Sequence, residues 1–202
     1  MKKLYVNIER IHIVGDISQL SELVKQIDVS LQNLTDYTDR LTAYLVRNSN
    51  ENYGRQYQVM VEATNELRKE LYQASMDFND LQRQVILFQN KIYRYEDISA
   101  SAAAPNPYLV KMTQINVNTS GVQYNLQEMR NLVATLHNYS EAVMYHIRNI
   151  SARKNEAARF WRDEQYRDFA DFIEQIIQHV ERNLRGFDEY ISYLEEKIRE
   201  LS

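Results

Sequence analysis

The sequence predicts a mainly α-helical protein made of two tandem long helical hairpins, packed as a coiled-coil-like four-helix bundle, with a short β-strand before each hairpin. Three observations support this fold class. The 202 residues include only four Gly and two Pro, and long stretches without either are typical of long helices. Apolar residues recur every three or four positions through four stretches, as packed amphipathic helices require. The same order of segments occurs twice along the chain.

The first element of each half is the predicted strand. Apolar and polar residues alternate from Leu4 to Ile13, with one change of phase, which is typical of a strand with a bulge. A more diluted alternation from Leu109 to Val117 predicts the second strand, and Gly15 and Gly121 follow the two segments. A two-stranded ribbon leaves its edges open. We therefore expect these edges to recruit another subunit.

Four heptad-patterned stretches follow the strands as two pairs. The second is the most regular and predicts a helix from about Arg55 to Glu96, roughly 60 Å long at about 1.5 Å per residue. The fourth stretch carries a second apolar stripe beside its main seam. Exposing that stripe would be costly, at roughly 1.5–3 kcal/mol per large apolar side chain. We therefore expect the two hairpins to pack against each other in the chain, or in a homo-oligomer.

An internal repeat divides the chain into residues 1–98, a linker at 99–107, and residues 108–202. Both prolines fall in the small-residue stretch around the linker, which is typical of a boundary. A shift of 105 residues relates the first and third stretches, for example Leu31 to Leu136. A shift of 109 relates the second and fourth, for example Phe78 to Phe187. Each half thus contains one strand and one hairpin.

Composition and charge restrict the function classes. The chain has no Cys, which excludes disulfides, thiolate zinc sites and a cysteine nucleophile. The chain has a net charge of −4 and so lacks the positive field that is typical of nucleic-acid-binding proteins. We therefore expect no nucleic-acid partner. No window reaches the roughly 18 apolar residues that a membrane span needs. We expect a cytoplasmic protein at synthesis, with leaderless secretion left open.

The sequence offers no catalytic or cofactor motif. A carboxylate-bridged metal pair in a helical bundle needs Glu-x-x-His on two helices, and only Glu9 with His12 has this spacing, in the predicted strand. No G-x-S-x-G, P-loop or G-x-G-x-x-G element occurs, so no nucleophile elbow or phosphate cradle is predicted. We expect no enzyme activity, no metal and no cofactor.

The break between the third and fourth stretches holds the only Trp of the chain. Trp161 is followed by Arg162 and Asp163 and preceded by Arg159, in a locally basic segment. Trp and Arg are enriched at binding hot spots, so these four residues are candidates for docking a partner. The alternative interpretation is that Trp161 plugs the end of the bundle and the surrounding charges are solvated.

Each half resembles the WXG-type helical hairpins associated with type VII secretion, which carry a W-x-G turn between two amphipathic helices. The second half reads Trp161-Arg162-Asp163 at this turn, with Asp in place of Gly. The first half has Tyr53 and Gly54 adjacent at its break, and both join the candidate partner-binding residues. The family's Y-x-x-x-[DE] export signal has a match at Tyr93 and Asp97. The resemblance implies a non-enzymatic partner or substrate of a secretion apparatus.

Two functions therefore stay open on the sequence. The first is a WXG-like interaction protein connected with type VII-like secretion. The second is an intracellular coiled-coil scaffold or adaptor that assembles with itself or with another protein. Both imply a protein partner or a homo-oligomer.

Overall fold

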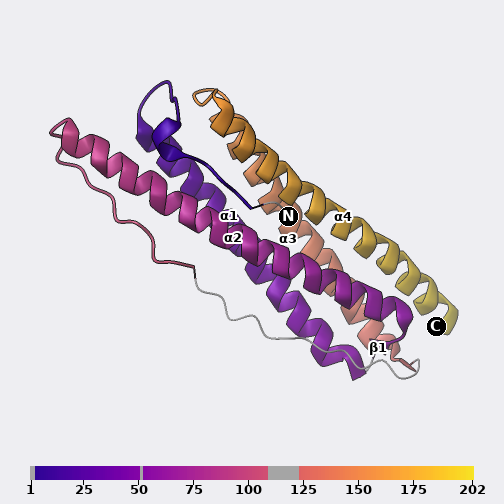
Figure 1. The fold of residues 1–202 in the computed structure, drawn as a ribbon. Helices are drawn as coiled ribbons and strands as arrows, with labels where there is room; N and C mark the ends of the chain where they lie inside the picture. The colour runs from indigo at the N-terminus through magenta and orange to yellow at the C-terminus, as the bar shows by residue number, and fades with distance from the viewer. Residues whose placement is uncertain (1–2, 51, 109–122) are drawn as a thin grey trace.

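The computed structural model describes residues 3–50, 52–108 and 123–202. In these residues the chain forms two helical hairpins (Figure 1), made of the helices α1 (Ile17–Arg47), α2 (Arg55–Tyr95), α3 (Leu126–Ala157) and α4 (Glu164–Leu201). The predicted long hairpins are confirmed, and the predicted helix from about Arg55 to Glu96 coincides with α2.

The two hairpins pack against each other as one four-helix bundle. Helix α1 contacts α2 and α3, and α4 contacts the same two helices. α1 and α4 run in one direction and α2 and α3 in the other, so each helix is antiparallel to both of its neighbours (Figure 1). The α1–α2 turn and the α3–α4 turn therefore lie at opposite ends of the bundle. A single hydrophobic core extends through both halves of the chain.

Three of the helices begin at a side-chain cap. The carboxylate of Asp16 accepts a hydrogen bond from Ser18 N at 2.8 Å, and Asn125 caps α3 in the same way. Asp163 caps α4 by accepting from Tyr166 N at 3.1 Å. Gly54 precedes α2 without a side-chain cap. Caps of this kind satisfy backbone N–H groups that have no partner within the helix.

Residues 109 positions apart occupy equivalent places in the two hairpins. Glu70 and His179, which are separated by 109, form an ion pair between α2 and α4. Tyr37 and His146, with the same separation, place their ring centroids 5.8 Å apart between α1 and α3. In a twofold arrangement a residue meets its own equivalent only at the axis. These two contacts therefore locate an approximate twofold axis through the middle of the bundle.

The starts of the helices obey the same relation. α1 and α3 begin 109 residues apart, and so do α2 and α4. The shift of 105 seen in the apolar pattern differs from this by four residues, about one helical turn. Such a difference leaves the same face of the helix buried, which is why the sequence pattern alone did not identify the spatial equivalence.

Each hairpin turn pairs with the segment that precedes the other hairpin. Strand β1 (Asn52–Tyr53), in the first turn, pairs antiparallel with β2 (Gln123–Tyr124), just before α3. In the second turn, Trp161 forms an isolated antiparallel bridge with Ile13, just before α1. The two halves are therefore clasped reciprocally, one clasp at each end of the bundle.

The predicted strand over Leu4 to Ile13 is wrong. Within residues 3–13 the chain is extended around a short 3₁₀ turn, η1 (Ile8–Arg10), and the bridge from Ile13 is its one β-type pairing. The predicted alternation is correct, because Leu4 and Val6 are buried while Tyr5 is exposed. Side chains of α2 and α4, rather than a second strand, accept the backbone N–H groups of Leu4 and Asn7. The other predicted strand, Leu109 to Val117, lies outside the described residues.

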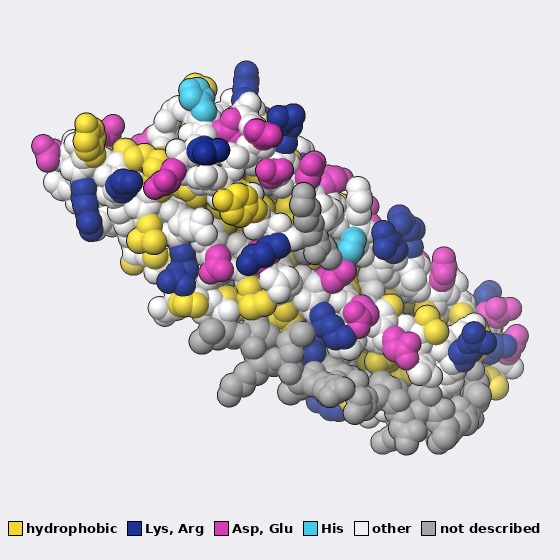
Figure 2. All heavy atoms as spheres, viewed as in Figure 1, with side chains coloured by type: hydrophobic (Ala, Val, Ile, Leu, Met, Phe, Trp, Pro, Cys, Tyr) yellow, Lys and Arg dark blue, Asp and Glu magenta, His cyan; other side chains and the backbone are white. Residues whose placement is uncertain are grey.

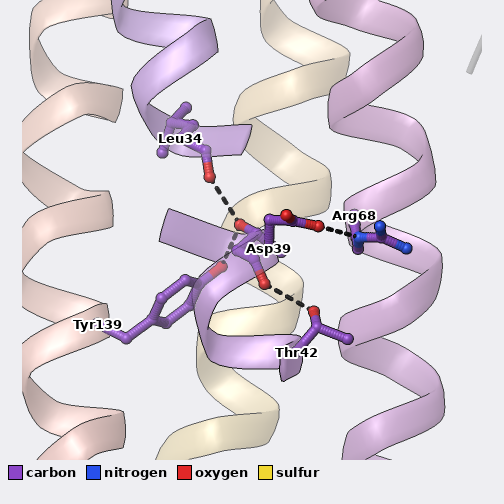
Figure 3. Close-up of polar contacts among 6 residues, drawn as sticks. Leu34, Asp39, Thr42, Arg68 and Tyr139 are labelled. Carbon is purple, nitrogen blue, oxygen red and sulfur yellow. Dashed lines mark hydrogen bonds and ion pairs between the residues drawn. The ribbon is translucent and has the colours of Figure 1, made fainter. Parts of the chain in front are cut away.

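The core also contains a polar connection between helices (Figure 3). The buried hydroxyl of Thr38 donates to Leu34 O at 2.8 Å, so the Tyr139 hydroxyl, 2.8 Å away on α3, is the donor in their contact. Burial raises the pKa of Tyr139, which keeps it protonated and able to donate. Between α1 and α2, the buried guanidinium of Arg68 pairs with Asp39 at 2.5 Å (Figure 3).

Candidate functional site

A groove between α2 and α4 runs along one face of the bundle and is covered over only part of its length. Residues 3–13, the strap, follow the groove near the α3–α4 turn, where Figure 1 shows them between the two helices. We call this part the closed half. The open half continues beyond the Glu70–His179 ion pair toward the α1–α2 turn and forms a hollow of about 760 Å³.

Backbone hydrogen bonds to both helices hold the strap in the closed half. Leu4 N donates to Asp77 Oδ2 of α2 at 3.1 Å, and Asn7 N donates to Gln165 Oε1 of α4 at 2.6 Å. A third bond joins His12 N to the Asp163 carboxylate. The strap residues Leu4, Val6 and Ile8 are buried.

Aromatic side chains form the base of the closed half. The ring centroid of Phe78 lies 5.8 Å from that of Phe169 and 5.9 Å from that of Phe172. Trp161 extends this cluster, with its ring 5.1 Å from Phe169. Ring separations of this size are favourable for aromatic pairs. The strap therefore lies beside a dense aromatic cluster at this end of the bundle.

The open half has an apolar base and a charged rim. Its base includes Met60, Leu67 and Phe187, which are buried. Val59, on its α2 side, is 57% exposed. The rim carries charges of both signs, namely Arg55, Glu66, Glu70, Arg182 and Glu189. Figure 2 shows similar interspersion of acidic, basic and apolar side chains over the face that it views.

The internal repeat shows which side chains differ between the two halves of the groove. At positions 109 residues apart, Phe169 of the closed half corresponds to Met60 of the open half, and Phe172 corresponds to Ala63. Asp77, which anchors Leu4, corresponds to Gly186, and a Cβ added at Gly186 would meet nothing within 4 Å. Other lining positions differ in the opposite sense, because Tyr190 and Tyr193 of the open half correspond to Leu81 and Gln84.

One anchor of the closed half is retained in the open half. Gln165, which accepts from the strap backbone, corresponds to Gln56, and Gln56 lines the open half. The base is retained in part as well, since Phe78 corresponds to Phe187. The open half therefore keeps an acceptor and an apolar surface like those that hold the strap.

The structure places the tryptophan predicted for partner docking inside the protein. Trp161 is fully buried, and its indole Nε1 donates to Asp163 Oδ1 at 2.8 Å. The Asp163 carboxylate also caps α4 and accepts from His12 N. Arg159 and Arg162 are exposed around this plug. The observed position of Trp161 is the one that the second interpretation of the sequence described.

Tyr53 and Gly54 lie at the opposite end of the bundle from Trp161. Tyr53 belongs to β1 and its side chain lies outside the described residues, so only its backbone pairing with Gln123 is defined. Gly54 has a φ of 150°, a value that favours glycine. By the 109-residue relation Gly54 corresponds to Asp163, and both precede the second helix of their hairpin. The six predicted residues therefore form two separate groups.

Sequence reasoning missed the open half of the groove. None of its lining residues belongs to a motif, and the apolar ones read as ordinary heptad positions. A signal was available in the repeat: wherever a bulky residue in one copy matches Ala or Gly in the other, the two copies cannot fill the same volume. Such a comparison of Phe172 with Ala63 and of Asp77 with Gly186 identifies the site.

Comparison with protein-family models, with curated proteins and with solved structures found no match for this chain. Over residues 3–50, 52–108 and 123–202, no group of His, Asp and Glu side chains is arranged to hold a metal ion. None of the described helices is long and apolar enough to cross a lipid bilayer.

Proposed function

We propose that the chain is a non-enzymatic protein–protein interaction protein. The observation that carries this proposal is the open half of the α2–α4 groove, a hollow of about 760 Å³ with an apolar base. Concave surfaces that combine apolar lining with a few polar groups are typical binding sites. The two hairpins already bury their seams against each other, and Val59 in the lining of this groove is an apolar side chain that stays 57% exposed.

The resemblance to WXG-type hairpins gives this proposal its biological setting. Each half is an antiparallel pair of long helices, and the turn residues Gly54 and Asp163 stand at equivalent positions. We propose that the protein is a partner or substrate of a type VII-like secretion apparatus. The alternative is an intracellular scaffold that assembles with itself or a partner, a role for which a bundle clasped at both ends would also be suited.

Site-specific photocrosslinking tests the interaction function. A photoreactive amino acid at Val59, which is exposed in the open half, should give a discrete adduct of higher mass in cells. The same substitution at Val29, exposed to a similar degree on α1, is the matched control and should give none. Equal labelling from both positions, or none from Val59, would argue against a partner in the groove.

The location of the protein separates the two settings. We expect the full chain to be recovered from the culture medium of its host without cell lysis if it is exported. A cytosolic marker protein reports lysis. Absence from the medium, together with a stable crosslinked partner in the cytoplasm, would reject the secretion setting and favour the scaffold.

A further inference from the structure

We infer that an apolar surface where the strap runs beside the C-terminal part of α2 binds a second copy of this chain, in a twofold-symmetric dimer. The surface lies at the end of the bundle near the α3–α4 turn (Figure 1). It shares no lining residue with the open half of the α2–α4 groove. We call it the strap–α2 patch, and its apolar members are Tyr5, Ile11, Leu87, Phe88, Ile92 and Ile98.

The patch combines exposed apolar side chains with two adjacent hollows. Tyr5 of the strap is 75% exposed and Leu87 of α2 is 61% exposed, and both line a hollow of about 390 Å³. A second hollow of about 510 Å³ has Ile92 and Ile98 in its lining. Phe88 lines both hollows, so the apolar surface is continuous. Continuous apolar surface often marks a site of contact with another molecule.

The internal repeat shows that the fold does not require apolar residues at this place. Leu87 corresponds to Glu196 and Phe88 to Lys197, each 109 residues further along the chain. Glu196 is exposed on α4. The equivalent place on the second hairpin therefore carries charged residues, as the solvated face of a helix usually does. Contact with another protein molecule explains why α2 differs from α4 here.

The charges beside the patch favour a second copy as the partner. Glu9 of the strap and Lys91 of α2 lie 3.7 Å apart, and their side chains are 77% and 74% exposed. In a twofold dimer the same surface stands on both sides, so a contact of one residue with another occurs twice, once in each direction. Lys91 of each chain can then face Glu9 of the other. A surface of a single charge sign would be repelled by one of these two residues.

The form of the patch agrees with a twofold contact. Such an interface needs exposed side chains and hollows within one surface, because each chain must receive what the other presents. Tyr5 and Leu87 lie beside the hollow that Ile92 and Ile98 line, so this surface supplies both. One contact would cover these apolar side chains on both chains at once, which is favourable.

The mass of the full chain over a range of concentrations, measured by sedimentation equilibrium, tests this inference. We expect the unmodified chain to approach twice the mass of one chain as its concentration rises. Leu87→Glu introduces the residue found at the equivalent position of α4 and should weaken the dimer by about tenfold or more. Val29→Glu, at a position of α1 that is 51% exposed, is the matched control and should dimerise as the unmodified chain does. Circular dichroism verifies that each variant folds.

Exchanged charges distinguish a contact between chains from the ion pair within one chain. Glu9→Lys sets lysine against lysine across the dimer, and Lys91→Glu sets glutamate against glutamate, so each variant alone should dimerise more weakly. A mixture of the two variants should regain the dimer, because each chain then meets opposite charges on the other. The ion pair within each chain stays broken in the mixture, so it cannot account for the recovery.

Three results would overturn the inference. The first is the mass of one chain at every concentration; a crosslink in cells from a photoreactive residue at Leu87 to a protein of another size would then assign the patch to a different partner. The second is an equal effect of Leu87→Glu and Val29→Glu on the dimer, which would place the contact elsewhere. The third is a mixture of the charge variants that does not regain the dimer.

Two other experiments answer different questions. Deletion of the strap removes part of the patch and also exposes the aromatic cluster beneath it, so a changed mass would have two causes. The crosslink from Val59 reports on the α2–α4 groove, so the proposed function and the dimer can each fail without the other.

Discussion

Replacement of Asp28 by Asn should stabilise the protein above pH 6 and leave its stability unchanged near pH 4. Asp28 lies in α1 and is only 3% exposed. Its Oδ2 accepts from Gln32 Nε2 at 2.9 Å, whereas its Oδ1 has no hydrogen-bond partner within the described part of the chain. A buried carboxylate with an unsatisfied oxygen is costly to ionise.

The expected magnitude follows from the pKa of this side chain. Burial raises the pKa of Asp28 from 3.8 to about 6, against a smaller lowering by hydrogen bonds from Gln32 and Asn79. Between these two pH values the folded state binds more protons than the unfolded state, so its free energy of unfolding falls as pH rises. The full difference corresponds to about 3 kcal/mol. It is absent below about pH 4 and fully present above about pH 6.

Urea unfolding followed by circular dichroism, at intervals from pH 4 to pH 8, measures the difference between the variant and the unmodified protein. We expect Asp28→Asn to be more stable by about 1–3 kcal/mol at pH 7.5, which is a rise in Tm of about 2–10 °C for a chain of this size. The control is Asp36→Asn, at an exposed position of the same helix, which should show no such pH dependence.

Two outcomes would refute this reasoning about Asp28. One is a stability difference that is the same at pH 4 and pH 7.5, because a neutral and an ionised carboxyl would then be equally tolerated. The other is a variant that is less stable than the unmodified protein at pH 7.5. Titration of the Asp28 carboxyl carbon by NMR gives an independent reading, with a midpoint near pH 6 expected.

Two further predictions concern the end of the bundle near the α3–α4 turn. Trp161→Ala should lower the free energy of unfolding by about 3–5 kcal/mol, because it empties a fully buried site. The control is exposed Arg162→Ala, which should change it by less than about 0.5 kcal/mol. Similar small effects of both variants in thermal melts would contradict the interpretation that Trp161 plugs the end of the bundle. Deletion of residues 1–13 should uncover the aromatic cluster at Phe78. We expect this variant to bind more of a fluorescent dye that reports exposed apolar surface, and to have a larger mass in light scattering. An unchanged mass together with no dye binding would show that the strap covers nothing essential.

Much of the helical architecture could be predicted from the sequence because its signals are local and strongly periodic. The seam from Tyr57 to Val85 is buried, as its heptad spacing predicted. The strand over Leu4 to Ile13 could not be distinguished from an extended strap, because both bury every second side chain. What differs is the partner of the backbone N–H groups, and the acceptors Asp77 and Gln165 are distant in sequence.

The candidate site was harder to predict for a related reason. Its distinguishing feature is missing volume at Ala63 and Gly186, and an absent side chain leaves no periodic signal. The residues predicted at the turns, Trp161 and Gly54, were selected because Trp and Gly are rare in this chain. In the structure, Trp161 fills the core and Gly54 precedes α2 with a positive φ.

The contact of Glu70 with His179 has a consequence for how such a chain could diversify. In a dimer of two identical hairpins, this position would bring a residue against its own copy, with carboxylate facing carboxylate or imidazole facing imidazole. Covalent fusion removes that restriction, because the two copies mutate independently, and an acid and a base can then stand on either side of the axis. The same freedom allows a bulky residue at one end of the bundle and a small one at the other. A permanently symmetric assembly would have the two halves of the groove alike, whereas in the described part of the fused chain only one of them is covered by a strap.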